Sequence, residues 1–126
     1  MVDVAAAVIV REGRLLITQR RPDAPQGSLW EFPGGKRRPR ESLTACLRRE
    51  LKEELDITVE VGARLDTIVH AYPDYAVRLH FYRCRLRSGK PKPLGCQAIA
   101  WVKPKALGRY KFPEADHALI RSLLNG

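Results

Sequence analysis

The sequence predicts an α/β fold in which a mixed β-sheet packs between helices. Two observations support this prediction. Short apolar segments bounded by turn-forming residues are typical of strands, and two segments without glycine or proline have helical periodicity. These segments follow the order of three strands, a helix, three strands and a second helix. Because 126 residues are enough for one core but too few for two, we expect a single domain over residues 1–126.

Three apolar segments before the first helix have the character of strands: residues 4–10, 15–17 and 29–32. The first two flank Glu12-Gly13, and this arrangement predicts a hairpin. Residues 21–28, of sequence RPDAPQGS, are rich in turn formers and predict a surface loop. Pro33-Gly34-Gly35 is expected to break the third strand.

The first helix is expected over residues 41–55, which contain neither glycine nor proline. Leucines recur at every fourth position of this segment: Leu43, Leu47, Leu51 and Leu55. At about 100° per residue they form one apolar stripe, so the segment predicts an amphipathic helix.

The second half of the chain is expected to add three strands and a closing helix. Valine, isoleucine, leucine and aromatic residues dominate the strand segments: residues 57–69, 75–86 and 99–102. Tyr72-Pro73-Asp74 predicts the turn between the first two, and residues 88–93 predict a basic turn. Residues 116–124 predict an amphipathic helix, for which Asp116 is a candidate N-cap.

The first predicted helix carries acidic residues beside its apolar stripe. On a helical wheel with Leu43 at 0°, Glu50 lies at about 340° and Glu54 at about 20°. Ion pairs such as Arg49–Glu53 explain the charged face of the helix but not these two positions, where repulsion and lost hydration are costly. A bound cation removes both costs, and Mg²⁺ prefers oxygen ligands. The segment therefore predicts metal-assisted chemistry on a phosphate compound.

Composition excludes several classes of protein. Apolar residues make up 44% of the chain and charged residues 29%, as in ordinary globular proteins. No segment has the ~20 apolar residues that span a bilayer, and the first residues lack the basic region of a signal peptide. Cys46, Cys84 and Cys96 form no C-x-x-C pair, so we expect neither a disulfide framework nor a zinc cluster, and a cytoplasmic location.

The formal net charge of +9 favours an anionic partner. The charge alone does not distinguish among a nucleotide, a nucleic acid and an acidic protein surface as the partner. The basic residues are scattered, without a long basic tail or an arginine–aromatic repeat, so a dedicated RNA-binding function is not favoured. We expect a nucleotide substrate, no membrane partner, and a monomer or homodimer.

The acidic helix and the loop before it resemble the signature of the Nudix hydrolases, G-x5-E-x7-R-E-U-x-E-E-x-G-U, where U is aliphatic. Eight of its nine fixed positions agree: Gly35, Glu41, Arg49, Glu50, Leu51, Glu53, Glu54 and Ile57. Other segments are similar to the MutT branch of this family: Arg21, residues 30–36, Gln97, Trp101-Val102 and residues 112–116. That branch includes nucleoside triphosphate pyrophosphohydrolases that clear oxidised or modified nucleotides. The resemblance spans nearly the whole chain and implies an α/β/α sandwich.

The resemblance implies which residues hold the metal. Glu50, Glu53 and Glu54 would bind Mg²⁺, for which Mn²⁺ is a substitute, and a backbone carbonyl at Gly35 would join them. Glu50 or Glu53 would lie near the attacking water. Arg49 would orient a glutamate through a charge-assisted hydrogen bond. The implied reaction is water attack on a phosphorus atom of the triphosphate, which gives a monophosphate and pyrophosphate.

The resemblance also implies where the nucleotide binds. Arg21 and Lys36 would contact phosphate, and Phe32 and Tyr110 are candidate apolar walls for the base. Asp116 stands where MutT-like enzymes place a residue that faces the base, and aspartate there is found in relatives resembling cytidine triphosphate pyrophosphohydrolases. The implied substrates are of the 8-oxo-dGTP or CTP/dCTP type, while the simple alternative for Asp116 is a helix cap.

Three departures from the family pattern leave other functions open. Asp56 replaces a glycine at the end of the helix, and Arg38 and Arg40 replace a glutamate and a glycine in the preceding loop. Gly95 stands six residues before Trp101, where relatives usually place one more glutamate. The alternatives are a Nudix module that binds nucleotide or RNA with weak catalysis, and an RNA 5′-end pyrophosphohydrolase.

Overall fold

The computed structural model describes residues 1–125, which form a seven-stranded sheet, two α-helices and two short 3₁₀ helices. The strands are β1 Val2–Arg11, β2 Arg14–Gln19, β3 Trp30–Glu31, β4 Gly34–Lys36, β5 Thr58–Ala71, β6 Ala76–Ser88 and β7 Ala98–Val102. The helices are α1 Leu43–Leu55 and α2 His117–Asn125, and the 3₁₀ helices are η1 Pro104–Arg109 and η2 Glu114–Asp116.

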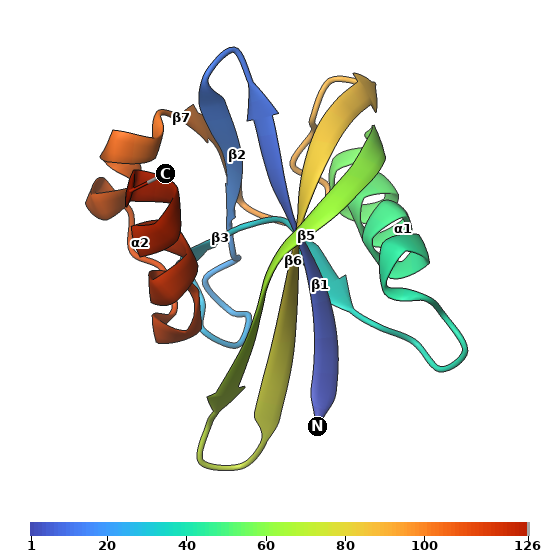
Figure 1. Cartoon of the computed structure of the whole chain (residues 1–126), viewed down its shortest axis with the longest axis vertical. Coiled ribbons are helices and arrows are strands. Elements are labelled where there is room, and N and C mark those ends of the chain that lie inside the picture. The colour runs from blue at the N-terminus through green and yellow to red at the C-terminus, as the bar shows by residue number, and fades with distance from the viewer. Residues whose placement is uncertain (126) are drawn as a thin grey trace.

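Strand β1 is the central strand of the sheet and pairs with three other strands. It pairs in parallel with β6 and antiparallel with β2 and β4. Strand β5 pairs antiparallel with β6, while β3 and β7 both pair with β2. Helix α1 lies on one side of the sheet and α2 on the other (Figure 1). The prediction of a mixed sheet between helices is confirmed.

Each helix buries its apolar residues against one face of the sheet. Leu47, Leu51 and Leu55 of α1 are fully buried in a core with residues of β1, β2 and β6. The second core lies on the α2 side and contains the aromatic side chains of Phe32, Phe81 and Phe112 together with Leu119 of α2. The leucine stripe predicted from the sequence therefore does face the sheet. No helix within residues 1–125 is long and apolar enough to cross a membrane.

Helix α1 begins two residues later than predicted. The hydroxyl of Ser42 accepts a hydrogen bond from the backbone N–H of Ala45 at 3.1 Å and caps the first turn. Glu41 consequently lies outside the helix, in the loop that connects β4 to α1. The second helix also begins later than predicted, because Asp116 belongs to η2 and α2 starts at His117.

The third strand ends at Glu31, before Pro33-Gly34-Gly35, as predicted, but the glycines begin a further strand that the sequence did not predict. Residues 34–36 form strand β4, in which Gly34 and Gly35 pair with Ala6 and Ala5 of β1. A side chain at Gly34 would overlap the carbonyl oxygen of Ala5. Glycine is therefore needed here because it lets two backbones approach closely, rather than because it ends a strand. The strand places Gly35 directly beside helix α1.

Asp56 ends helix α1 in the left-handed conformation, with φ 54° and ψ 44°, and its N–H donates to the carbonyl of Lys52. The turn that glycine makes in the family is thus preserved. The carboxylate pairs with Lys52 at 2.9 Å and with Lys92 at 3.2 Å. Hydrogen bonds from these two lysines lower the pKa of Asp56. The two ammonium groups offset the repulsion between the aspartate and the negative end of the helix.

We expect Asp56→Val to lower the melting temperature and Asp56→Asn to change it little. Asparagine adopts the left-handed conformation almost as readily as aspartate, whereas a β-branched residue is strained there. The exposed ion pairs lost in both variants are weak. Thermal unfolding followed by circular dichroism measures the difference, and equal melting temperatures for the two variants would contradict this account of the turn.

Candidate functional site

A cavity of about 670 Å³ lies against strands β1 and β4, helix α1 and the segment around η2. Charged side chains line part of it: Arg20, Glu31, Lys36, Glu50, Glu54 and Asp116. Apolar side chains line another part: Val4, Ala6, Phe32, Val77, Leu79 and Ala115. A cavity of this size with a few charged groups among apolar walls suits a small ligand that carries both a charged and an apolar part.

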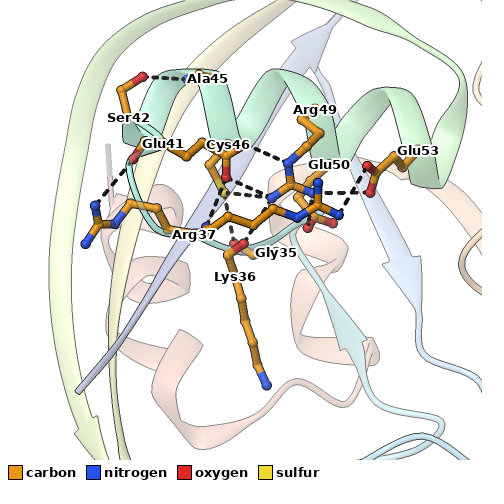
Figure 2. Close-up of polar contacts among 11 residues, drawn as sticks. Gly35, Lys36, Arg37, Glu41, Ser42, Ala45, Cys46, Arg49, Glu50 and Glu53 are labelled. Carbon is orange, nitrogen blue, oxygen red and sulfur yellow. Dashed lines mark hydrogen bonds and ion pairs between the residues drawn. The ribbon is translucent and has the colours of Figure 1, made fainter.

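The guanidinium group of Arg49 connects the loop before α1 to the acidic residues of the helix (Figure 2). It forms a bidentate pair with Glu41, with Nε–Oε2 at 2.6 Å and Nη2–Oε1 at 2.9 Å. Its Nη1 contacts Glu50 at 2.9 Å and Glu53 at 3.2 Å. Its Nη2 also donates to the carbonyl of Lys36 at 3.2 Å. One arginine thus holds three carboxylates and one backbone segment.

The Arg49–Glu41 pair remains charged across the working pH range. Hydrogen bonds from Arg49 and from the backbone N–H of Arg38 lower the pKa of Glu41 to about 2. The same pair raises the pKa of the Arg49 guanidinium above its usual value. Because neither partner changes its charge near neutral pH, the bridge gives Glu50 a fixed orientation.

Glu50 packs directly over the backbone of Gly35. A side chain at position 35 would overlap the carboxylate of Glu50, so only glycine permits this contact. The carbonyl oxygen of Gly35 accepts a hydrogen bond from the Cys46 thiol, with Sγ at 3.5 Å. The predicted pair of a Gly35 backbone group and a helix carboxylate is therefore brought together by the fold.

The carboxyl groups of Glu54, Glu31 and Glu50 are crowded together at the cavity. Burial is the main cause that raises the pKa of Glu54 to about 8, followed by the charges of Glu31 and Glu50. Burial also raises the pKa of Glu31, although the adjacent Arg20 at 3.0 Å opposes this shift. Crowded carboxylate oxygens of this kind match the ligand preference of a hard divalent cation. The residues present therefore fit the metal that the family resemblance implies.

Glu53 lies outside this group. Its carboxylate pairs with Arg49 at 3.2 Å and with Arg38 at 3.8 Å, its side chain is half exposed, and it does not line the cavity. Within residues 1–125, no three Asp, Glu, His or Cys side chains are arranged as a metal centre. The fold thus brings Gly35, Glu50 and Glu54 together at the cavity, while Glu53 is connected to Glu50 through Arg49 and lies outside the lining.

The expectation for Arg21 does not agree with the structure. Its Nη2 donates to the carbonyl of Leu94 at 2.8 Å, and the residue does not line the cavity. The preceding Arg20 lines the cavity instead and pairs with Glu31. Sequence reasoning missed both Arg20 and Glu31. Side chains alternate in direction along an extended segment such as β2 and the residues after it. This alternation was the available signal that only one of Arg20 and Arg21 faces the cavity.

The two candidate walls for a base differ in position. Phe32 is buried, lines the cavity and packs against Phe81 and Phe112. Tyr110 is not part of the lining; its ring packs edge-on against Trp30 with centroids 5.0 Å apart. The tyrosine therefore belongs to the α2-side core, and the expectation that it forms a wall of the cavity is wrong.

Asp116 is buried and lines the cavity. Asp116 directly precedes α2, but its carboxylate accepts no hydrogen bond from any residue of the described chain, so it does not act as a side-chain cap. Burial, followed by the charge of Glu31, raises its pKa to about 7. The carboxyl group is therefore held at the cavity without a partner from the described chain, where it is available to a ligand.

Gly95 packs against helix α1. Its N–H and that of Leu94 both donate to the carbonyl of Glu54 at 3.0 Å. A Cβ atom at position 95 would lie 2.9 Å from Cγ of Glu54, so a larger residue requires the glutamate to move. The Leu94-Gly95 segment therefore closes the end of helix α1.

The basic residues before α1 are partly engaged within the protein. Arg37 contacts Asp3 at 3.5 Å, and Arg38 contacts Glu53 at 3.8 Å. Arg40 has a φ of 67°, in the left-handed region that favours the glycine found in relatives. The substitution at position 40 thus keeps the backbone of the loop while it adds a charge.

A mixed sheet between two helices, with a glycine strand packed against a carboxylate-bearing helix beside a cavity, is the arrangement that the helix signature predicts for a Nudix hydrolase. The chain belongs to the Nudix family, because the family model described as the NUDIX domain matches residues 4–122. The prediction of this family from the helix signature is confirmed.

Curated relatives and solved structures support this membership over nearly the full chain. The CTP pyrophosphohydrolase of Escherichia coli K12 is 34% identical over 98% of this chain and 92% of its own length. The 8-oxo-dGTP diphosphatase of Haemophilus influenzae is 33% identical over 99% of this chain and 93% of its own. The solution structure of the E. coli ORF135 protein matches with a TM-score of 0.85 and 33% identity, covering 99% of this chain and 89% of that one.

Gly35→Ala should weaken divalent metal binding by tenfold or more, because the methyl group displaces the carboxylate of Glu50. Gly108→Ala is the matched control, since nothing lies within 4 Å of the added carbon there. Titration with Mn²⁺, followed by the electron paramagnetic resonance signal of the free ion, measures the affinity. Unchanged Mn²⁺ affinity in a folded Gly35→Ala variant would show that this contact does not position a ligand.

Proposed function

We propose that this chain is a Mg²⁺-dependent hydrolase that converts a nucleoside triphosphate into a nucleoside monophosphate and pyrophosphate. The observation that carries the proposal is a cavity lined both by Glu50 and Glu54 and by apolar residues such as Phe32. The charged lining suits a metal and a triphosphate, and the apolar lining suits a nucleobase. The relatives named as a CTP pyrophosphohydrolase and an 8-oxo-dGTP diphosphatase support the same reaction.

Glu50, Glu54 and the carbonyl of Gly35 would hold the metal. Glu53 would join them after rotation of its half-exposed side chain away from Arg38. When bound, a divalent cation neutralises phosphate oxygens and lowers the pKa of water. Mn²⁺ accepts the same oxygen ligands and would replace Mg²⁺.

The protein's own side chains would orient the reactants. A water oxygen forms a bond to a phosphorus atom, and the bond from that phosphorus to the bridging oxygen breaks, so that pyrophosphate leaves with the electron pair. We assign Glu50 or Glu53 to accept the proton of the water. Arg49 fixes the carboxylate of Glu50. Arg20 and Lys36 would bind phosphate oxygens, since both are basic residues of the cavity lining.

Phe32 and Asp116 would bind the base. The phenylalanine offers an apolar surface, and an ionised Asp116 accepts hydrogen bonds without donating any. This pattern favours bases that present N–H groups, such as the amino group of cytosine or the N1–H and N2–H groups of guanine. The candidate substrates are therefore of the CTP/dCTP or 8-oxo-dGTP type.

A panel of nucleotides tests the proposal. Free nucleoside triphosphates with normal, oxidised and methylated bases are incubated with Mg²⁺ or Mn²⁺, and released pyrophosphate is measured. Pyrophosphate release from at least one free nucleotide supports the proposal. RNA binding without turnover would support the weakly catalytic module that Gly95 favours, and turnover of 5′-triphosphorylated RNA alone would support an RNA 5′-end pyrophosphohydrolase.

Removal of the charge of the proposed ligands should lower turnover by well over tenfold in each of three variants: Glu50→Gln, Glu53→Gln and Glu54→Gln. Lys52→Gln should have little effect, because Lys52 lies on the exposed face of α1 and, among residues 1–125, pairs only with Asp56. The initial rate at saturating Mg²⁺ is the measurement. Full activity in both Glu53→Gln and Glu54→Gln would refute the assignment.

Asp116→Asn should change the ranking of cytosine, guanine and oxidised-guanine substrates, because asparagine donates hydrogen bonds that an ionised carboxylate cannot. The measurement is kcat/KM for each nucleotide. A ranking identical to that of the wild-type enzyme would exclude Asp116 from base recognition.

Stability provides the control for this variant. Because the folded-state pKa of about 7 lies above the ordinary value of 3.8, the wild-type protein loses stability as the pH rises between these two values. Asparagine does not ionise, so the Asp116→Asn variant does not lose this stability as the pH rises. Asp116→Asn should therefore melt at a higher temperature than the wild type at about pH 8, with the difference vanishing near pH 4.

A further inference from the structure

Three aromatic rings lie in series at the hairpin between β5 and β6, which extends beyond both α-helices (Figure 1). The ring of His70 packs against that of Tyr72 at a steep angle, with centroids 4.7 Å apart. Tyr72 stacks on Tyr75, with centroids 5.1 Å apart and 26° between the ring planes. The N–H of Tyr72 donates to the carbonyl of Tyr75 at 2.7 Å and closes the hairpin. We refer to Tyr72 and Tyr75 as the hairpin tyrosines.

The hairpin tyrosines belong to the wall of the cavity. Both line it together with Val77 and Leu79 of β6. Tyr75, Val77 and Leu79 are alternate residues of an extended segment, so their side chains point to the same face. The next residue of this series, Phe81, is buried in the α2-side core. The wall therefore continues without interruption from the core of the protein to the exposed hairpin.

One face of the Tyr75 ring is open. Tyr72 covers the other face, and among residues 1–125 no further aromatic ring packs on Tyr75. The residue is 49% exposed, whereas Tyr72 lies between two rings and is less exposed. Cross-strand aromatic pairs stabilise hairpins, but that role does not require either ring to line a cavity. An aromatic ring with a free face beside a cavity offers a stacking surface to a planar ligand.

The hairpin tyrosines adjoin the end of the cavity that contains Asp116. Strand β5 packs against η2, which includes Asp116, and Ile68 of β5 belongs to the α2-side core. The carboxylates that we assign to the metal, Glu50 and Glu54, belong to α1 on the other side of the sheet. The aromatic wall is therefore next to the part of the cavity that we assign to the base rather than to the metal.

We propose that the free face of Tyr75 stacks on the nucleobase of the substrate, while Tyr72 supports the ring from behind. This inference rests on the proposed function, because it concerns the base of the same nucleotide. Asp116 accepts hydrogen bonds from the amino group of cytosine and from the N–H groups of guanine alike. Stacking depends on the area of the base instead, so the contact with Tyr75 favours the two-ring base. Together the two contacts select a guanine-type nucleotide over a cytosine nucleotide.

The test measures binding without turnover. The whole protein is titrated in the presence of Mg²⁺ with the α,β-methylene analogues of GTP and CTP, and isothermal titration calorimetry gives the affinity. Tyr75→Leu should weaken binding of the GTP analogue about tenfold, which is the effect of losing one contact between a base and an aromatic ring. The loss for the CTP analogue should be smaller. Inorganic tripolyphosphate, which has no base, should bind equally to the wild type and to Tyr75→Leu.

Three further variants make the result specific. Tyr75→Phe keeps the ring and should bind both analogues as the wild type does. Tyr75→Trp enlarges the ring and should tighten binding of the GTP analogue, which tests the inference independently of the stability of Tyr75→Leu. Val69→Thr is the matched control: Val69 is 57% exposed, and its side chain points to the face of β5 opposite to that of His70. This variant should leave binding unchanged.

Three outcomes would overturn the inference. Equal affinity of the wild type and folded Tyr75→Leu for the GTP analogue would exclude a stacking contact. Equal losses in Tyr75→Phe and Tyr75→Leu would assign the contact to the hydroxyl group instead of the ring. An equal loss for tripolyphosphate would indicate that the phosphate end of the site had changed.

Pyrophosphate release separates this inference from the proposed function. Hydrolysis of GTP and CTP with the same KM in the wild type and in Tyr75→Leu would refute the stacking contact and retain the proposed function. Binding of the analogues that depends on the ring at position 75, without pyrophosphate release from any nucleotide, would refute the proposed function and support the stacking contact.

Discussion

The geometry of the site depends on the hydrogen bonds of the Arg49 guanidinium group. It reaches from helix α1 to Glu41 in the preceding loop, and it also contacts Glu50 and the Lys36 carbonyl. The pair with Glu41 forms only because the Ser42 cap leaves Glu41 outside the helix. The loop, the strand β4 and the carboxylate of Glu50 are therefore fixed relative to one another by a single charged group. A lysine could not replace it, because an ammonium group lacks the fork that engages several acceptors at once.

The second constraint is the close packing of strand β4 against its neighbours, which requires glycine at two positions. Gly34 lets β4 pair with β1, and Gly35 lets Glu50 lie over the strand. Arg49 then balances part of the carboxylate charge, but Glu54 is left buried with Glu31 nearby. Burial and the neighbouring carboxylates therefore favour the protonated form of Glu54, and a divalent cation that replaced this proton would relieve the crowding.

The sequence predicted those features that depend on local pattern. The leucine stripe, the hairpin of the first two strands and the carboxylates of α1 follow from periodicity. Strand β4 was missed, because three residues of strand have no period and are defined by pairing with a distant partner. The sequence did not indicate that Arg20 rather than Arg21 lines the cavity, for a related reason. Whether Arg20 or Arg21 faces the cavity depends on how the chain leaves β2, which is set by its hydrogen bonds to Leu29 and Leu94.

The separation of charge within the molecule explains how a strongly basic protein can have an acidic site. Its net charge is +9, yet Glu31, Glu50, Glu54 and Asp116 all line the same cavity. The excess positive charge lies elsewhere, including the exposed Arg83, Arg85 and Arg87 of β6. The long-range field of the protein therefore attracts an anionic nucleotide, while the carboxylates repel its phosphates at close range. A divalent cation reverses that local repulsion, so the acids that would exclude the substrate from the metal-free cavity become the groups that retain it.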